Sequence, residues 1–338
     1  MANPGRFRAV APGRVNLIGD HTDYMGGLAL PMAIDLATTI SGVRAGSRIK
    51  LRSEQFEEEL DLELPVIDPQ LTVPAWGRYV AGVAAELAST QGLIGTVTTT
   101  VPLGSGLSSS AALEVATALA LGDSGSPAEI AARCQQAEHL ASGVPCGIMD
   151  QLVITSGRSG HAMLIDFEDL EVTPVAVPDS AQFWVIHSGQ ERQLTTSAYS
   201  ERRAQAEAAA AQVGPLPKAD LGSINSLNDA VLRSRARHVM TECGRVQQFA
   251  TALQNCELVL CGHLMTESHA SLRDDYQVST DALDSLVKSL TATPGVYGAR
   301  LTGAGFGGCV VALADPSVQL DGWPVVPSEG ARIEWLGD

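Results

Sequence analysis

The chain has 338 residues, of which 45% are hydrophobic and 18% charged, so it is long enough to bury one large core or two smaller ones. Its formal net charge of −16 argues against non-specific binding to nucleic acid or to an anionic membrane surface. No run reaches the roughly 20 apolar residues of a membrane span, no apolar signal core opens the sequence, and the cysteines form no CxxC pair, so we expect a cytoplasmic protein.

The first segment with recognisable chemistry is a polar loop between apolar strands. We expect those strands at residues 7–12, 15–18 and 28–34. The loop before the last of them carries Asp20, His21, Asp23 and Tyr24. Carboxylates accept hydrogen bonds from hydroxyl groups, and a neighbouring histidine can donate or accept. The pattern indicates a polyol-binding site, with a solvated hairpin loop or a loose metal site as the alternatives.

The next stretch is predicted to be structural. Apolar residues alternate within 38–64 and predict hairpin strands that cover a core on one side. An amphipathic helix is then predicted to begin near Trp76. A tryptophan at a helix start is usually a packing anchor, and composition alone gives it no other role.

Residues 101–115, VPLGSGLSSSAALEV, predict a loop that becomes a helix from Ser108 onward. Pro102, Gly104 and Gly106 exclude a regular helix or a central strand in the first half. The serines that follow lie where a helix has unpaired N–H groups and the positive end of its dipole. This combination favours an anion-binding site, with an ordinary serine cap after a flexible loop as the alternative. No GK[ST] follows, so it is not a Walker-type loop.

Two further segments carry carboxylates, and the second of them is apolar around its carboxylate. A helix is predicted over 127–141 and contains Glu138, and the string VPCGIMDQ that follows carries Gly147 and Asp150. An unpaired buried carboxylate is costly, and Arg14 is the natural charge partner for Asp150. That pairing would keep Asp150 ionised and able to accept a proton. A purely structural ion pair is the alternative.

The rest of the chain changes character. We expect strands at 161–165 and 183–186, helices over 197–213 and within 229–290, and finally a strand, a glycine-dense turn and a strand in GVYGARLTGAGFGGCVVAL. No HxxxH or HExxH spacing occurs, so the histidines of the helical stretch do not predict a metal site. We place a domain boundary near Pro178, which divides the chain into residues 1–178 and 179–338.

Taken together, these motifs resemble those of the GHMP kinases, and most of all those of their galactokinase branch. GRVNLIGDHTDYMGG is similar to the family string GRVNLIGEHTDYNGG, and PLGSGLSSSAA, CGIMDQ and GAGFGGC follow in the family order. The resemblance extends over about residues 9–313. It implies an α+β fold with two lobes, of which the N-terminal lobe is like the second domain of ribosomal protein S5 and the C-terminal lobe is ferredoxin-like.

The resemblance also implies roles for individual residues, with a sugar and ATP as small-molecule substrates and Mg²⁺ as cofactor. Asp150 and Arg14 would be catalytic. The sugar would be bound by Asp20, His21, Asp23, Gly147 and Asp150. ATP would be bound by Trp76, Gly104, Ser105, Gly106, Leu107, Ser108, Ser109 and Ser110. The metal ligands would be Ser110 and Glu138.

The implied reaction is phosphorylation of D-galactose by ATP to α-D-galactose 1-phosphate. Asp20 stands where the family usually has glutamate, and no tyrosine precedes the string RARH, where the family often places one near the sugar. These departures keep a kinase of N-acetylgalactosamine, another hexose or a cyclitol as an alternative. A non-catalytic sensor of galactose and ATP and, less favoured, a mevalonate-type kinase are the others. We expect a monomer or a weak homo-oligomer.

Overall fold

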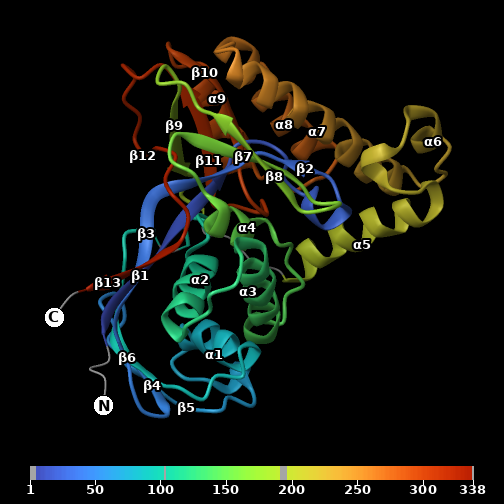
Figure 1. Cartoon of the computed structure of the whole chain (residues 1–338). Helices are drawn as coiled ribbons and strands as arrows, with labels where there is room; N and C mark the ends of the chain where they lie inside the picture. The colour runs from blue at the N-terminus through green and yellow to red at the C-terminus, as the bar shows by residue number, and fades with distance from the viewer. Residues whose placement is uncertain (1–4, 103, 191–195, 337–338) are drawn as a thin grey trace.

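The computed structural model describes residues 5–102, 104–190 and 196–336 (Figure 1). Leu103, in the predicted anion-binding loop, lies outside them. The strands are β1 (Arg6–Asn16), β2 (Leu28–Ala29), β3 (Pro31–Arg44), β4 (Arg48–Ser53), β5 (Leu60–Glu63), β6 (Leu93–Thr99), β7 (His161–Asp166), β8 (Glu171–Ala176), β9 (Gln182–His187), β10 (Val296–Leu301), β11 (Cys309–Ala314), β12 (Trp323–Val325) and β13 (Arg332–Leu336). The α-helices are α1 (Gly77–Glu86), α2 (Ser109–Leu121), α3 (Pro127–Ser142), α4 (Met149–Ser156), α5 (Thr196–Val213), α6 (Leu221–Asn225), α7 (Ala230–Gln254), α8 (Leu258–Asp274) and α9 (Asp281–Thr291).

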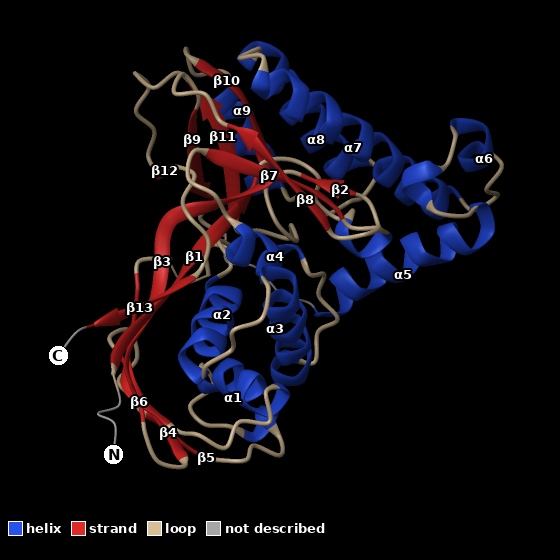
Figure 2. Ribbon diagram, in the orientation of Figure 1, coloured by secondary structure: helices blue, strands red, loops and turns tan. Residues whose placement is uncertain are grey.

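One lobe is a curved sheet with helices packed against it. Its six strands run in the order β13–β1–β3–β6–β4–β5, and helices α1 to α4 lie against one side (Figure 2). Alternate residues of a strand point to the same face of a sheet, so Phe7, Ala9 and Ala11 all enter the core beneath those helices. The Ala- and Leu-rich α2 is buried along its length among them.

The second lobe contains a four-stranded sheet in the order β10–β11–β9–β12 and the helices α5 to α9. The long strands β1 and β3 extend towards it, and Val15 and Met32 pack there with Phe183 and Phe249. A small sheet of β2, β7 and β8 lies beside α7 (Figure 2). The mixed arrangement confirms the predicted α+β class.

A bulge in β1 brings two distant motifs together. The pairing of β1 with β3 shifts register between Pro12 and Arg14, and a bulge re-aims the side chain that follows it. A Cβ at Gly13 would lie 2.8 Å from the carbonyl oxygen of Leu107. Glycine therefore permits this approach, and the Arg14 N–H donates to the Leu107 oxygen at 3.1 Å. The break expected between two short strands here is wrong, because the bulge keeps β1 continuous.

Other expectations can be compared directly with the elements. Helix α1 begins at Gly77, directly after Trp76, as predicted, and α2 begins at Ser109, one residue after the predicted start at Ser108. The last strand, β13, was not predicted, and it pairs with β1 at the edge of the first sheet. The domain boundary near Pro178 stays a prediction. In the described part of the chain, no helix is both long and apolar enough to cross a membrane.

Candidate active site

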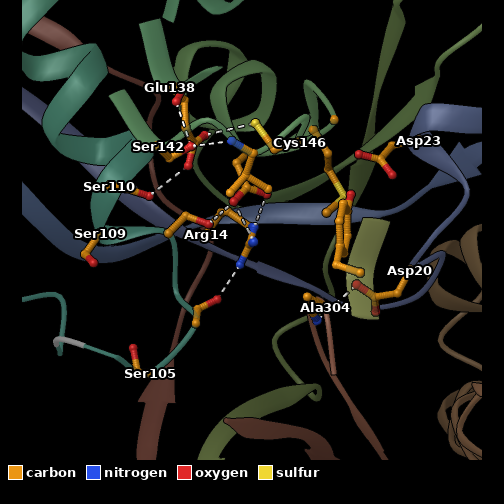
Figure 3. Close-up of a pocket in the computed structure, with 18 of the residues that line it drawn as sticks. Arg14, Asp20, Asp23, Ser105, Ser109, Ser110, Glu138, Ser142, Cys146 and Ala304 are labelled. Carbon is orange, nitrogen blue, oxygen red and sulfur yellow. Dashed lines mark hydrogen bonds and ion pairs between the residues drawn. The ribbon is translucent and has the colours of Figure 1, made fainter. Parts of the chain in front are cut away.

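A cavity of about 950 Å³ opens where β1, the start of α2, α3 and the loop before α4 meet (Figure 3). Its wall contains all the predicted site residues except Trp76 and Leu107, namely Arg14, Asp20, His21, Asp23, Gly104, Ser105, Gly106, Ser108, Ser109, Ser110, Glu138, Gly147 and Asp150. Figure 3 shows Ser110, Glu138 and Cys146 on one side of Arg14, and Asp20 and Asp23 on the other. The structure thus assembles residues from four separate motifs around a single cavity.

Arg14 and Asp150 form the polar centre of the wall. The guanidinium donates from Nε to Oδ1 at 2.8 Å and from Nη2 to Oδ2 at 2.7 Å, and it also donates from Nη1 to the carbonyl of Gly106 at 2.6 Å. The Arg14 side chain is buried, whereas that of Asp150 keeps 28% of its surface exposed. A bidentate pair of this kind fixes both partners in orientation, so one carboxylate edge is held while part of the group still faces the cavity.

Ser108 joins this pair and does not cap its own helix. It occupies the N-cap position of α2 with φ 61° and ψ 47°, and it makes no side-chain cap hydrogen bond. Its Oγ donates instead to Oδ2 of Asp150. An L-residue in the left-handed region carries strain that the surroundings must hold in place. The simple capping interpretation is therefore not what the geometry shows for Ser108.

The loop before α2 is shaped for a close approach to its backbone. Gly104 and Gly106 have φ of 71° and 76°, a region that glycine enters at little cost. Ser105 Oγ donates to the carbonyl of Pro102 at 2.6 Å, which closes the turn. The unpaired N–H groups of the α2 N-terminus then face the same cavity as the loop, the arrangement that binds phosphate elsewhere.

Ser110, near the start of α2, and Glu138, on α3, bring two hard oxygen atoms side by side. Ser110 Oγ lies 3.3 Å from Glu138 Oε1, close to the separation of about 3 Å between adjacent oxygens around Mg²⁺ at 2.0–2.1 Å. Burial, and then the charge of Asp150, raise the pKa of Glu138. Among the described residues, no group of three or more His, Cys, Asp or Glu could hold a metal. The pair fits Mg²⁺ only if phosphate and water oxygens complete its coordination.

The loop after β1 is tied to the glycine-dense turn near the C-terminus. Asp20 accepts the Gly303 N–H at Oδ1, at 3.0 Å, and the guanidinium of Arg300 at Oδ2. His21 pairs its Nδ1 with the Tyr24 hydroxyl at 2.8 Å and its Nε2 with the Ala304 carbonyl at 3.2 Å. Two motifs about 280 residues apart in sequence thus share one wall of the cavity.

Asp23 faces the cavity from the same loop and lies against Gly147. A Cβ at Gly147 would be 1.6 Å from Oδ2 of Asp23, so no larger residue fits without displacing that carboxylate. Burial, with further contributions from the charges of Asp150 and Asp20, raises the pKa of Asp23 to about 6. The folded protein therefore holds the Asp23 carboxylate where its ionised form is less stable than it would be in water.

We expect Asp23→Asn to stabilise the protein at alkaline pH. A raised folded-state pKa contributes stability below the unfolded value of 3.8, and that stability is lost as the pH rises through about 6. The shift sets an upper bound of about 3 kcal/mol, which solvent screening reduces to about 1 kcal/mol because the Asp23 side chain is only half-buried beside the cavity. Urea unfolding at pH 8 and pH 4 should show the variant more stable at pH 8 and equal at pH 4. Equal stability at pH 8 would contradict the assignment.

Of the tyrosines in the wall, the sequence indicated Tyr24 but not Tyr79 or Tyr199. Tyr24 and, from α5, Tyr199 line the cavity, with ring centroids 5.8 Å apart, and Tyr199 also lies 5.7 Å from the His21 ring. The position before RARH, where the family often has a tyrosine, lies in α7 and holds none here, whereas the ring of Tyr199 reaches the cavity from α5, two helices earlier in the chain. A tyrosine beside a charged run gives no sign of this, because only the packing of α5 shows where it points.

Trp76 and Leu107 lie outside the wall. Leu107 is buried, and it reaches the site through its backbone carbonyl. The Trp76 ring stacks on Phe56 with centroids 6.2 Å and planes 10° apart, and its indole N–H donates to the carbonyl of Glu58 at 3.3 Å. A role for Trp76 in binding a base stays a prediction.

Comparison with known proteins gives family matches along the chain. Residues 2–44 match a galactokinase galactose-binding signature, residues 78–158 the N-terminal domain of GHMP kinases, and residues 249–321 their C-terminal domain. The galactokinase of Canis lupus familiaris is 45% identical over 327 residues, which cover 91% of this chain and 83% of that protein.

Solved structures agree with these matches. The galactokinase of Lactococcus lactis, solved in complex with galactose, superimposes with a TM-score of 0.90 at 29% identity, and the alignment covers 97% of this chain and 95% of that one. The mevalonate kinase of Methanococcus jannaschii aligns over 91% of this chain and 90% of its own with a TM-score of 0.67 at 21% identity, which shows a common fold.

Proposed function

Because this chain belongs to the galactokinase family of the GHMP kinases, we propose that it transfers the γ-phosphoryl group of ATP to the anomeric hydroxyl of D-galactose. The products are α-D-galactose 1-phosphate and ADP. The observation that carries this proposal is the bidentate Arg14–Asp150 pair, which lies between the anion-binding loop and the carboxylate-bearing loop of one cavity. A phosphoryl donor and a hydroxyl acceptor bound on either side would meet there.

The anion-binding loop holds the β- and γ-phosphates. Gly104, Ser105 and Gly106 let phosphate oxygens approach the backbone, and the N–H groups of Ser109 and Ser110 add the positive end of the α2 dipole. Arg14 stabilises the charge of the transferring group, since its Nη1 already lies within this loop at the Gly106 carbonyl. The strong net negative charge of the chain makes such local donors necessary.

Ser110 and Glu138 would hold Mg²⁺ beside the phosphates. When bound, the ion neutralises phosphate charge as it builds up on the leaving group. The protein's own part is to present two oxygens at 3.3 Å and to keep the Glu138 carboxylate from turning away. Cys146 Sγ, 3.3 Å from Glu138 Oε2, helps to hold it.

The anomeric hydroxyl donates a hydrogen bond to the carboxylate of Asp150. The sugar oxygen attacks phosphorus, the bond to the bridging β–γ oxygen breaks, and the hydroxyl proton passes toward the Asp150 carboxylate. Arg14 and Ser108 fix the orientation of that carboxylate before the substrate arrives. Positioning of this kind supplies much of the rate enhancement in phosphoryl transfer.

Asp20, His21, Asp23 and the backbone at Gly147 bind the other sugar hydroxyls, and Tyr199 forms part of the same wall. Asp20 is shorter than the glutamate usual in the family, and Arg300 and Gly303 hold its carboxylate toward the C-terminal glycine turn. This favours one second candidate, a kinase whose sugar carries a larger substituent at the position that Asp20 faces, such as N-acetylgalactosamine.

Three further parts of the proposal concern the chain as a whole. We place it in the cytoplasm, in line with six cysteines none of which forms a disulfide in the described residues. Its lobes comprise residues 1–178 and 179–338, with β13 returning to the first sheet. We propose that it works as a monomer or a weak homo-oligomer.

An assay of ADP release with ATP, Mg²⁺ and a panel of sugars tests the function. We expect galactose to be turned over, and glucose, N-acetylgalactosamine and inositol to be turned over at least about 100-fold more slowly in kcat/KM, because mispaired hydroxyls leave buried polar groups unsatisfied. Preferred turnover of another panel member would keep the mechanism and overturn the substrate. Binding of galactose and ATP without any turnover would support a sensor instead.

A further inference from the structure

A fully buried glutamate lies directly behind the Ser110–Glu138 pair. Glu114 is one helical turn after Ser110 on α2 and has no exposed surface, and Gln151, the residue after Asp150 on α4, is equally buried. Neither side chain lines the cavity. Neither residue is among the predicted site residues, and the proposed mechanism does not use them.

One amide nitrogen connects three helices. Gln151 Nε2 donates to Glu114 Oε2 at 3.0 Å and to Glu138 Oε2 at 2.6 Å. Because both neighbours of this atom are carboxylate oxygens, the amide must be oriented with its NH2 group toward them. Both hydrogens of the Gln151 amide are therefore donated to glutamates, one on α2 and one on α3.

This arrangement leaves two acceptors without a donor. Glu114 Oε1 and Gln151 Oε1 are both buried and have no hydrogen-bond partner in the described structure. Buried polar atoms are nearly always paired, and each unpaired one costs free energy. The two unpaired atoms belong to the Glu114 carboxyl and the Gln151 amide, which the hydrogen bond from Gln151 Nε2 to Glu114 Oε2 already joins.

A single proton would satisfy both acceptors. We propose that Glu114 is a neutral carboxylic acid whose Oε1–H donates to Gln151 Oε1, so that acid and amide form a two-bond ring that holds the Glu138 carboxylate in place. Glu114 and Gln151 are then positioning residues for the phosphoryl transfer proposed above, and this part of the inference depends on that function. With Glu138 Oε2 fixed by Gln151, its Oε1 is the oxygen left beside Ser110.

The surroundings of Glu114 support the neutral form. Burial, and then the charge of Glu138, raise its pKa, and Asp150 adds to the effect. A negative charge on Glu114 would contribute to raising the pKa of three neighbouring groups, namely Cys134, Cys146 and Tyr79. None of these three groups carries a positive charge that could stabilise an ionised Glu114.

Glu242 on α7 provides a comparison, because it is a buried glutamate whose pKa is lowered rather than raised. It is just as buried, but Arg245 donates to its Oε2 at 2.8 Å and Ser268 to its Oε1 at 2.5 Å. Burial alone would raise the pKa of Glu242, but the charges of Arg245, His238 and Arg300 outweigh burial and bring it to about 2. Replacement by glutamine should therefore be tolerated at Glu114 and should destabilise the protein at Glu242.

We would compare Glu114→Gln, Glu114→Leu and Glu242→Gln with the unaltered chain. A glutamine at position 114 can donate and accept hydrogen bonds as the neutral acid does. We therefore expect the melting temperature of Glu114→Gln to stay within a few degrees, and the Mg²⁺ concentration it requires to stay within about threefold. Leucine keeps the volume but loses the ring, and a lost supporting group of this kind typically weakens metal affinity or activity 10- to 100-fold. Glu242→Gln should lower the melting temperature by about 5 °C or more.

Two readouts do not depend on turnover. Infrared difference spectra at neutral pH should contain the carbonyl stretch of a protonated acid that Glu114→Gln removes, and calorimetry should show Mg·ADP binding weakened by Glu114→Leu but not by Glu114→Gln. An absent acid band, or equal losses in the two variants at position 114, would overturn the proposal and point to an ionised Glu114 with a buried water or ion. If Glu114→Leu does not fold, Gln151→Met makes the same comparison. No turnover by the unaltered chain would contradict the function alone, because these two readouts still test the ring.

Discussion

Replacing Asp150 by asparagine is expected to lower kcat for galactose by about 10³-fold, within the range that a positioned acid or base contributes. The substitution keeps the shape of the side chain but removes the negative charge that faces the anomeric hydroxyl in the proposed mechanism, and it sets an amide NH2 against one donor of Arg14. Galactose and ATP should still bind within about tenfold of their normal affinity, because most of the contacts proposed for them lie on the flanking loops. The ADP-release assay and calorimetry measure the two quantities separately.

Asp179→Asn, at an exposed position outside the cavity, is the matched control and should leave kcat unchanged. Asp150→Ala separates the two roles open to this carboxylate. Asparagine still accepts one hydrogen bond, so an orienting role predicts that Asp150→Asn retains more activity than Asp150→Ala, while a proton-accepting role predicts equal losses. Unchanged turnover in Asp150→Asn would remove Asp150 from the mechanism altogether.

The walls of the cavity were predictable where a motif is contiguous in sequence. The loop before α2 contains glycines, serines and a helix start within a few residues, so its chemistry can be inferred from local backbone rules. The pairing of Arg14 with Asp150 was also predictable, because a buried carboxylate in an apolar segment needs a cation. The closure of the loop at Asp20 by Arg300 and Gly303 was not predicted, since it depends on a contact between opposite ends of the chain.

The remaining features depend on packing between elements. Tyr199 reaches the cavity because α5 packs beside the loop that carries Tyr24. Glu114 looked like one charged residue in a helix, and only the burial of α2 on every side shows that it faces Gln151. Strand β13 closes the first sheet by pairing with β1 across the whole sequence. Long-range contacts of this kind have no local periodicity, so a single sequence does not indicate them.

Gly147→Ala should raise the KM for galactose by about 100-fold and leave the KM for ATP within about twofold. The new Cβ would lie 1.6 Å from Oδ2 of Asp23, so this carboxylate must move by more than 1 Å, and displacements of that size at a binding site cost about 10²-fold. The anion-binding loop does not touch this contact. Initial rates with each substrate varied in turn measure both constants.

A glycine in an open position provides the control. Nothing lies within 4 Å of a Cβ built at Gly244, inside helix α7, so Gly244→Ala should leave both constants unchanged and stabilise the helix by about 1 kcal/mol. The clash predicted for Gly147→Ala can be tested further by removing the Asp23 carboxylate, which the new Cβ would meet. In an Asp23→Ala background, Gly147→Ala should add little further loss, because two changes that act through one contact are not additive. Additive losses, or a normal KM for galactose in a folded Gly147→Ala variant, would mean that the fit between Gly147 and Asp23 does not control sugar binding.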